Sequence, residues 1–242
     1  MPFSRTQLLL GRKAMQTLND SHVAVFGVGG VGGYVAEVLA RSGVGAITVI
    51  DNDRVDISNI NRQIIALHST VGQYKVDVVA GRIRDINPDC RVTALQMFYL
   101  PSNADEIDLT SFSYVADCID TVAAKLELIR RCHELHVPII SSMGAANKMD
   151  PTAFRVADIN KTQIDPLAKV IRKKLRQLGI PSLKVVYSEE TPLSYAEGET
   201  PPADGRRRSI PASNAFVPPA AGLAIGGEII KDLINYPHSA TV

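Results

Sequence analysis

Cysteine is scarce in this sequence, and none of it has the spacing of a metal or redox motif. The 242 residues include three cysteines, Cys90, Cys118 and Cys132, and no CxxC pair. An odd number of cysteines cannot be fully paired, and a zinc site built from cysteines needs close pairs, so a disulfide scaffold and a structural zinc site are both disfavoured. Unpaired thiols are typical of a reducing compartment. We interpret all three cysteines as ordinary residues.

The sequence also lacks a large net charge and a long apolar run. Its formal net charge is +1 at pH 7, so no global field directs the chain to nucleic acid or to a membrane, and any nucleic-acid surface must be local. The apolar run Leu8 to Leu10 is too short for the core of a signal peptide. The long uncharged stretch 209–227 is interrupted by prolines. We therefore expect a cytoplasmic protein without a membrane segment.

What the sequence does contain is a globular composition and a regular alternation of elements. Apolar residues make up 45% of the chain and charged residues 21%. Short runs rich in Val and Ile alternate with segments of helical periodicity, which predicts an α/β fold: a doubly wound, Rossmann-like, mostly parallel sheet with helices on both faces. The expected strands are 23–27, 46–51, 91–95, 114–119 and 137–141, and the expected helices are 30–42, 74–87 and 121–136.

The composition changes near residue 150. We divide the chain into a core, residues 1–150, and an extension, residues 151–242, that continues the same domain. In the extension we expect strands at 152–159 and 182–188, a basic helix at 166–178 and a terminal helix at 220–235. Residues 189–213 combine four glutamates, prolines and the triplet Arg206 to Arg208 with few apolar residues, which predicts a mobile loop.

A glycine-rich loop follows the first expected strand and opens the next helix. The run GVGGVG places glycine at 27, 29, 30 and 32 and fits the pattern G-x-G-x-x-G. Such glycines let backbone amides approach a phosphate or ribose, and the helix N-terminus favours negative charge. The pattern indicates a nucleotide site at Gly27, Gly29, Gly30 and Gly32, although a tight turn without a ligand is the alternative.

Acidic residues follow the second strand. Asp51 comes about 20 residues after the glycines, where a carboxylate can bind a ribose hydroxyl, and this fits NAD and ATP equally well. Asp53 is a second candidate on the same turn, and for both an ordinary turn or capping aspartate is the alternative.

Cations and a further carboxylate distinguish triphosphate chemistry from nicotinamide chemistry. Arg62 and Lys75 lie on the polar connection after the second strand, and Asp120 ends the run YVADCID, directly after the expected strand 114–119. Cations over the phosphates and a carboxylate for magnesium are what chemistry on ATP requires. The GxxxxGK[ST] motif of P-loop enzymes is absent.

These motifs together resemble the adenylating domain of the ThiF/MoeB and ubiquitin-activating-enzyme superfamily. The resembling pieces are GVGGVG, Asp51-Asn52-Asp53, Asn59-x-x-Arg62-Gln63, Lys75 and Asp120, in order and over about residues 3–142. The resemblance implies activation of a carboxylate by Mg²⁺ and ATP to give an acyl-adenylate and pyrophosphate. It also implies that Asp51 binds ribose, that Asn59, Arg62 and Lys75 bind the phosphates with Gln63 nearby, and that Asp120 binds magnesium. The segment around Arg5 resembles the N-terminal piece that lends an arginine to a partner subunit's ATP, which implies a homodimer, and a solvated terminal arginine is the alternative.

Within that superfamily the chain is most similar to the tRNA threonylcarbamoyladenosine dehydratases. The resembling pieces are SRTQLLLG at 4–11, the segment 144–169 and FVPPAAG at 216–222. The resemblance implies ATP-dependent cyclisation of the threonylcarbamoyl group on a tRNA adenosine beside the anticodon. Because the neighbouring carbamoyl group can attack the adenylated carboxyl, no enzyme cysteine is needed.

A tRNA substrate predicts a local basic surface. Cations crowd the expected helix 166–178, and we expect them to contact backbone phosphate independently of sequence, although a solvated helix face is the common alternative. They are Lys169, Arg172, Lys173, Lys174 and Arg176.

Other functions stay open at this stage. The first is adenylation of the C-terminus of a ubiquitin-like sulfur-carrier protein, which the lack of CxxC pairs disfavours. The second is an NAD-dependent oxidoreductase, which leaves Arg62, Lys75 and Asp120 without a common purpose. The third is a nucleotide-sensing scaffold that binds ATP and releases no AMP. A sulfur-transfer protein is a further partner that the sequence leaves undecided.

Overall fold

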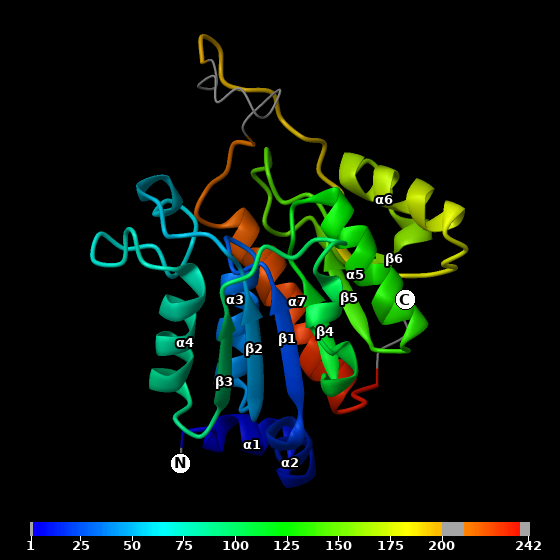
Figure 1. The fold of residues 1–242 in the computed structure, drawn as a ribbon. Helices are drawn as coiled ribbons and strands as arrows, with labels where there is room; N and C mark the ends of the chain where they lie inside the picture. Colours follow the sequence, from blue (N-terminus) through cyan, green and yellow to red (C-terminus); the bar gives the residue numbers. More distant parts are fainter. Residues whose placement is uncertain (1, 200–210, 238–242) are drawn as a thin grey trace.

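A seven-stranded sheet forms the centre of the computed structural model, which describes residues 2–199 and 211–237 (Figure 1). The strand order is β3-β2-β1-β4-β5-β7-β6, and every pairing is parallel except that of β6 with β7. The predicted doubly wound α/β fold is therefore confirmed. The strands are β1 His22–Phe26, β2 Ala46–Ile50, β3 Arg91–Leu95, β4 Tyr114–Asp117, β5 Ile139–Ser142, β6 Phe154–Asp158 and β7 Lys184–Ser188.

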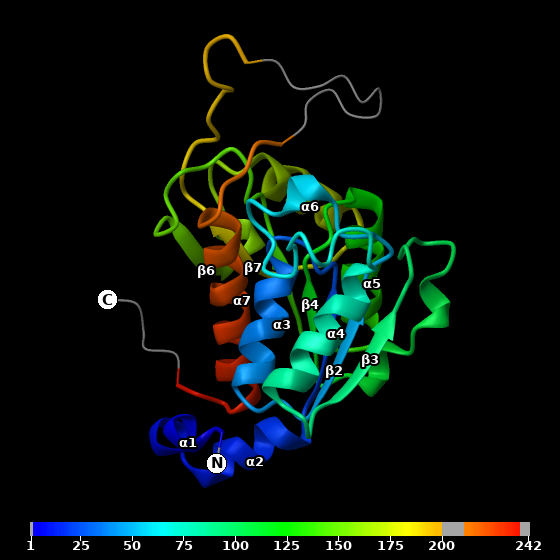
Figure 2. The ribbon, with the colours of Figure 1, turned by 90° about the vertical axis from the view of Figure 1, so that its left-hand side faces the viewer.

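Helices cover both faces of this sheet. One face carries α3, α4 and α7, and the other carries α5 and α6 (Figures 1 and 2). Each face has its own apolar core, because the buried parallel strands are apolar on both sides. The helices are α1 Ser4–Leu10, α2 Arg12–Asp20, α3 Gly32–Arg41, α4 Lys75–Ile86, α5 Val122–Glu134, α6 Pro166–Gln177 and α7 Val217–Leu233.

The packing of α7 on α3 brings the C-terminal part of the chain to the glycine loop. Two glycines of α7 make this close approach possible: a Cβ at Gly226 would lie 2.6 Å from Val38 Cβ, and one at Gly222 would collide with the Val31 carbonyl. The first turn of α7 consequently lies beside the loop, where a Cβ at Gly30 would be 3.2 Å from Pro218 Cβ. Residues 211–216 therefore reach the same end of the sheet as the glycines.

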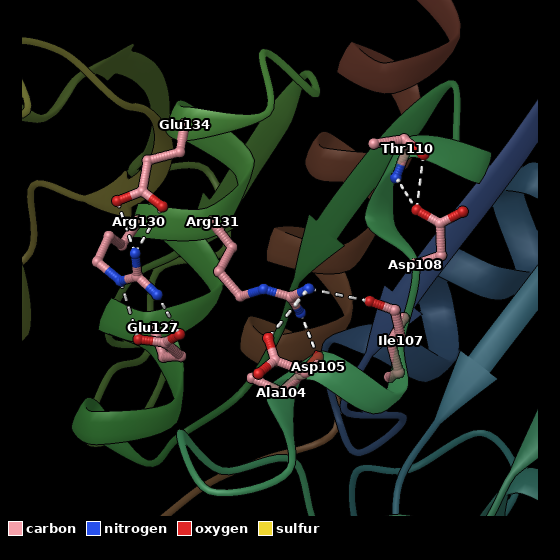
Figure 3. Close-up of polar contacts among 9 residues, drawn as sticks. All are labelled: Ala104, Asp105, Ile107, Asp108, Thr110, Glu127, Arg130, Arg131 and Glu134. Atoms are coloured by element: carbon pink, nitrogen blue, oxygen red, sulfur yellow. Dashed lines mark hydrogen bonds and ion pairs between the residues drawn. The ribbon is translucent and has the colours of Figure 1, made fainter.

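A connection between β3 and β4 is fastened to α5 by arginine. Arg131 donates to the carbonyl of Ala104 and, at 3.2 Å, to that of Ile107, while the neighbouring Arg130 pairs with Glu127 and Glu134 on its own helix (Figure 3). The first arginine thus holds two segments together, whereas the second stays within one helix.

Several elements differ from their expected bounds. Strand β4 ends at Asp117, so Asp120 lies on the turn that follows it. Helix α7 begins at Val217, earlier than expected, because proline fits the first turn of a helix, where no intrahelical partner for its missing N–H is needed. Helices α1 and α2 were not expected.

Residues 200–210, including Arg206 to Arg208, lie outside the described residues, so mobility of the 189–213 loop stays a prediction. Within the described ranges, no helix is long and apolar enough to cross a membrane.

Candidate functional site

The glycine loop joins β1 to α3 at the carboxyl end of the sheet. Gly27 has φ of +81°, and a Cβ there would lie 2.8 Å from the Cys118 carbonyl, so its backbone conformation and its neighbour both require glycine. Gly29 and Gly30 instead face the connection after β2, with Gln63 Nε2 at 3.7 Å from a Cβ at Gly29 and Arg62 Cγ at 3.6 Å from one at Gly30. The loop and the predicted phosphate-binding connection are therefore neighbours.

Asp51 fixes the shape of this loop. Its Oδ2 accepts from the Val28 amide at 2.9 Å and its Oδ1 from the Asp53 amide at 2.8 Å. Each carboxylate oxygen keeps further acceptor capacity, so a ribose hydroxyl could still donate to it. Asp51, the predicted ribose-binding residue, thus lies directly beside the glycine loop.

Lys75 and Asp53 form an ion pair at the start of α4. Lys75 Nζ lies 2.7 Å from Asp53 Oδ2, and the two side chains are 7% and 60% exposed, respectively. The ammonium is thus largely buried, and its partner is an exposed carboxylate. An anionic phosphate could replace that carboxylate at low cost, because the phosphate would pair with the same buried ammonium while the exposed carboxylate returns to water.

The connection after β2 places Asn59, Arg62 and Gln63 close together. The amide oxygen of Asn59 accepts from the Asp56 amide at 3.1 Å, which closes a capping box. Arg62 Nη1 donates to the Ser58 carbonyl at 2.8 Å and to Asn61 at 2.9 Å. Asn59 therefore already has a structural role in the capping box. Arg62 contacts neutral oxygens, so its positive charge is not neutralised by these contacts.

Gln63 carries an unusual feature for a site residue. It is buried, and its Oε1 has no hydrogen-bond partner within the described chain. Buried polar atoms in native proteins are nearly always paired, so an orphan acceptor beside the glycine loop indicates a place for a ligand or a water molecule.

Asp120 lies on the turn after β4, on the same rim. It is exposed, and its Oδ1 accepts from the Thr121 hydroxyl at 3.3 Å. In the described ranges no three His, Cys, Asp or Glu residues gather as metal ligands. Magnesium does not need such a cage, since it is commonly bound by one or two carboxylates together with phosphate and water. The single carboxylate fits magnesium that arrives with a triphosphate.

Sequence analysis missed a buried network that supports this rim. Lys125 Nζ donates to Asp117 Oδ2 at 2.7 Å, to Ser141 Oγ at 3.0 Å and to the Ser142 carbonyl at 3.0 Å. Both charged side chains are fully buried. Asp117 Oδ1 also accepts from the Ile119 amide at 3.2 Å. The network therefore joins α5 to the ends of β4 and β5 and shapes the turn that carries Asp120.

The three thiols are unsuited to nucleophilic chemistry. Burial raises the pKa of Cys90 to about 11 and the pKa values of Cys118 and Cys132 to about 12. A thiol with such a pKa stays protonated at neutral pH and is a poor nucleophile. Their interpretation as ordinary residues agrees with this.

The basic helix predicted at 166–178 is α6, and its cations are of two kinds. Lys169, Lys173, Lys174 and Arg176 are exposed, and we call these four the α6 basic face. Arg172 is partly buried, and its Nη1 donates to the carbonyls of Ile159 and Thr162 and, at 2.6 Å, to the Thr162 hydroxyl. Arg172 thus fastens α6 to the preceding segment.

Arg5 stands apart from the other predicted site residues. It is exposed on α1, and α1 and α2 lie at the end of the sheet opposite the glycine loop (Figures 1 and 2). Phe3, just before α1, and Met15 of α2 lie beside Gly43, which follows the far end of α3. Within one chain, Arg5 therefore does not join the site.

Comparison with known proteins adds to this geometry. Residues 3–240 match the ThiF family. The tRNA threonylcarbamoyladenosine dehydratase of Bacillus subtilis is 49% identical over 240 residues, which cover 96% of this chain and 94% of that protein. The crystal structure of the Escherichia coli tRNA N6-threonylcarbamoyladenosine dehydratase, TcdA, in complex with ATP is similar with a TM-score of 0.86 and 37% identity over 96% of this chain and 93% of that chain. Its complex with AMP gives the same TM-score with 38% identity over 96% of this chain and 94% of that chain.

Proposed function

Because the chain belongs to the ThiF family, we propose that it is an ATP-dependent tRNA threonylcarbamoyladenosine dehydratase. In this reaction the carboxylate of the threonylcarbamoyl group attacks the α-phosphate of ATP, and pyrophosphate leaves. The carbamoyl group next to it then attacks the activated acyl carbon, AMP leaves and a ring closes, with net loss of water. The observation that carries the proposal is 49% identity to a dehydratase over nearly the whole of both chains.

The site supplies what the first step needs. A carboxylate and a triphosphate repel each other, so the enzyme must hold them together and screen their charge. Gly29 and Gly30 leave room for the nucleotide beside the loop, and Asp51 orients its ribose. Arg62 and Lys75 contact the phosphates, and Lys75 exchanges Asp53 for a phosphate oxygen. Asp120 is the residue that would hold magnesium, which when bound neutralises phosphate charge.

The second step uses a nucleophile that the substrate carries itself. An intramolecular attack requires orientation and gives no covalent bond to the enzyme. The raised pKa values of all three thiols fit this route. They also disfavour a thioester step on an enzyme cysteine, while adenylation of a sulfur-carrier protein is disfavoured by the lack of CxxC pairs. The NAD-dependent alternative does not account for the cations and Asp120 at one rim.

We assign tRNA binding to the α6 basic face. Its four cations are exposed, and helix α6, which carries them, lies beside α5 on one flank of the molecule (Figure 1). Contacts of lysine and arginine with backbone phosphate need no base recognition and weaken as salt rises. Arg172 is left out of this face because its guanidinium is engaged within the fold.

A homodimer completes the proposal. Arg5 lies far from its own glycine loop, so it can serve as an arginine finger only for a second copy of the chain. The exposed Leu8 and Leu9 on the same helix offer apolar area for that contact. A cytoplasmic location and a sulfur-transfer partner stay predictions.

Mass spectrometry of the tRNA nucleosides tests the proposed function. The protein is incubated with Mg²⁺, ATP and tRNA bearing threonylcarbamoyladenosine, and the tRNA is then digested. We expect a nucleoside lighter by one water, with one AMP released for each product. Unmodified tRNA is the control and should give neither. Formation of AMP with a carrier protein, without change in the modified tRNA, would contradict the proposal.

A further inference from the structure

Buried polar atoms without a partner are few in this protein and are not spread evenly. In the described part of the chain they are Gln63 Oε1, Tyr99 OH, Lys148 Nζ and Ser213 Oγ. Gln63 belongs to the nucleotide site described above. Lys148 and Ser213 lie at the same end of the sheet and have no assigned role. An unpaired buried donor costs free energy, so each of them calls for a ligand, a water molecule or a functional reason.

Lys148 lies on the loop that follows β5 and is 3% exposed. Its Nζ is 3.6 Å from Asp165 Oδ2, too far for a hydrogen bond. The Asp165 carboxylate is already used by the amides of Gly144, at 3.1 Å, and Ala168, at 2.9 Å. The Asp165 carboxylate therefore compensates the charge of the Lys148 ammonium, but none of the three N–H groups of Lys148 donates a hydrogen bond within the described chain.

The segment that holds Ser213 runs alongside the loop that holds Lys148, because the Asn147 amide donates to the Ala212 carbonyl at 2.8 Å. Asn61, the neighbour of Arg62, donates to the Ser213 carbonyl at 3.0 Å. Asn214 donates to the Lys148 carbonyl at 2.8 Å. The segment before α7 thus bridges the phosphate-binding connection and the loop after β5, on the rim that Figure 2 shows above β7 and α7.

We propose that Lys148 Nζ and Ser213 Oγ form a subsite for the threonylcarbamoyl group, an inference that rests on the proposed function. The phosphate cations Arg62 and Lys75 lie on the β1 and β2 side of the point where strand order reverses, and Lys148 lies on the β5 side. The acyl end of the substrate must occupy that second side, because the nucleotide fills the first. A carboxylate or a urea carbonyl accepts from the ammonium, and the serine hydroxyl pairs with the urea.

Binding at this subsite has a chemical consequence. A buried ammonium beside the attacking carboxylate offsets its repulsion by the phosphates, in surroundings that screen charge poorly. Because Lys148 Nζ is enclosed, the substrate reaches it only when residues 211–214 shift. Asn147 holds that segment, since its Oδ1 accepts from the Ala212 amide at 2.7 Å.

The test compares Ser213→Ala, Lys148→Gln and Lys148→Arg with the wild type. Ser213→Ala removes a hydroxyl that pairs with nothing inside the protein, so the fold should lose no stability. We expect Ser213→Ala and Lys148→Gln each to lower kcat/KM for modified tRNA by about tenfold or more, as for removal of a hydrogen bond to a charged or polar partner. Affinity for ATP and for unmodified tRNA should stay within about twofold, and Lys148→Arg should restore part of the activity. Lys13→Gln, on exposed α2, is the matched control and should change none of these values.

Each other result counts against a defined part of the proposal. Wild-type kcat/KM in both Ser213→Ala and Lys148→Gln would show that ordered water alone satisfies these groups and would overturn the subsite. Equal losses for ATP, unmodified tRNA and modified tRNA would overturn it in favour of a structural role. A wild-type enzyme that leaves modified tRNA unchanged would overturn the proposed function itself, and the subsite with it.

Discussion

At the scale of single residues, the pairing of Lys75 with Asp53 allows a variant that loses phosphate binding while the fold keeps its stability. Lys75 is enclosed and its carboxylate partner is 60% exposed, so replacing Lys75 leaves only an exposed carboxylate and no buried charge. We expect Lys75→Ala to lower the rate of AMP formation by about 10²-fold, as for removal of one preorganised cation from the phosphates. Steady-state release of AMP and a thermal melt measure the two effects.

Asp53→Asn is the matched variant for this pair. It removes the carboxylate and leaves Lys75 in place, so AMP formation should fall far less than in Lys75→Ala. If both variants lose activity equally, Asp53 has a direct role toward the nucleotide, and the exchange of carboxylate for phosphate is wrong.

The ion pair between Lys125 and Asp117 has the opposite character, because neither side chain is exposed. Lys125→Met would leave the Asp117 carboxylate buried without its cation, and we expect a loss of about 3–5 kcal/mol in the free energy of unfolding. Urea unfolding measures it. The double variant Lys125→Met with Asp117→Asn should recover part of the loss, since it removes the charge that was left. If Lys125→Met were as stable as the wild type, the buried pair with Asp117 would not stabilise the fold as we propose.

At the scale of elements, helix α6 carries the prediction for tRNA. Replacing Lys173, Lys174 and Arg176 by Gln should weaken tRNA binding and reduce the slope of log affinity against log salt by about 0.7–0.9 for each phosphate that the variant no longer neutralises. Filter binding over a salt series measures both values, and ATP affinity should not change. Arg172→Gln is the contrasting variant: it should lower the melting temperature, because it removes hydrogen bonds to Ile159 and Thr162. An unchanged slope in the triple variant would remove α6 from the tRNA surface.

Elements with strong periodicity are predictable from the sequence, and their ends are not. The helix expected at 74–87 is α4, Lys75–Ile86, and the strands of the extension join the same sheet as β6 and β7. The start of α7 escapes sequence analysis because Pro218 and Pro219 resemble helix breakers, whereas Asn214 caps this end by accepting from the Val217 amide. Helices α1 and α2 are short, with seven and nine residues, and Leu18 is their one buried residue, so no long apolar run marks them in the sequence.

At the scale of the whole molecule, the sequence names candidate site residues along the chain but does not give their contacts. The glycine loop, Asp51 and the connection with Arg62 follow from local patterns. The Lys125–Asp117 network and the link from Asn61 to Ser213 join separate elements, and only the sheet order brings them together. Arg131 likewise has the pattern of a solvated helix cation, yet it fastens a distant connection (Figure 3). No local signal marks such contacts.

The placement of Arg5 far from its own glycine loop leads to a prediction about assembly. If Arg5 serves the partner's site, Arg5→Ala and Asp120→Ala should each be nearly inactive alone. Mixed subunits should regain activity, because an Arg5→Ala subunit keeps Asp120 and receives Arg5 from an Asp120→Ala partner. With random exchange, about half of the dimers are mixed and each has one intact site, so about a quarter of wild-type AMP formation should return. Mixing after reversible dissociation, with each variant mixed with itself as control, measures this. A mixture no more active than its two components would show that Arg5 does not act across the dimer.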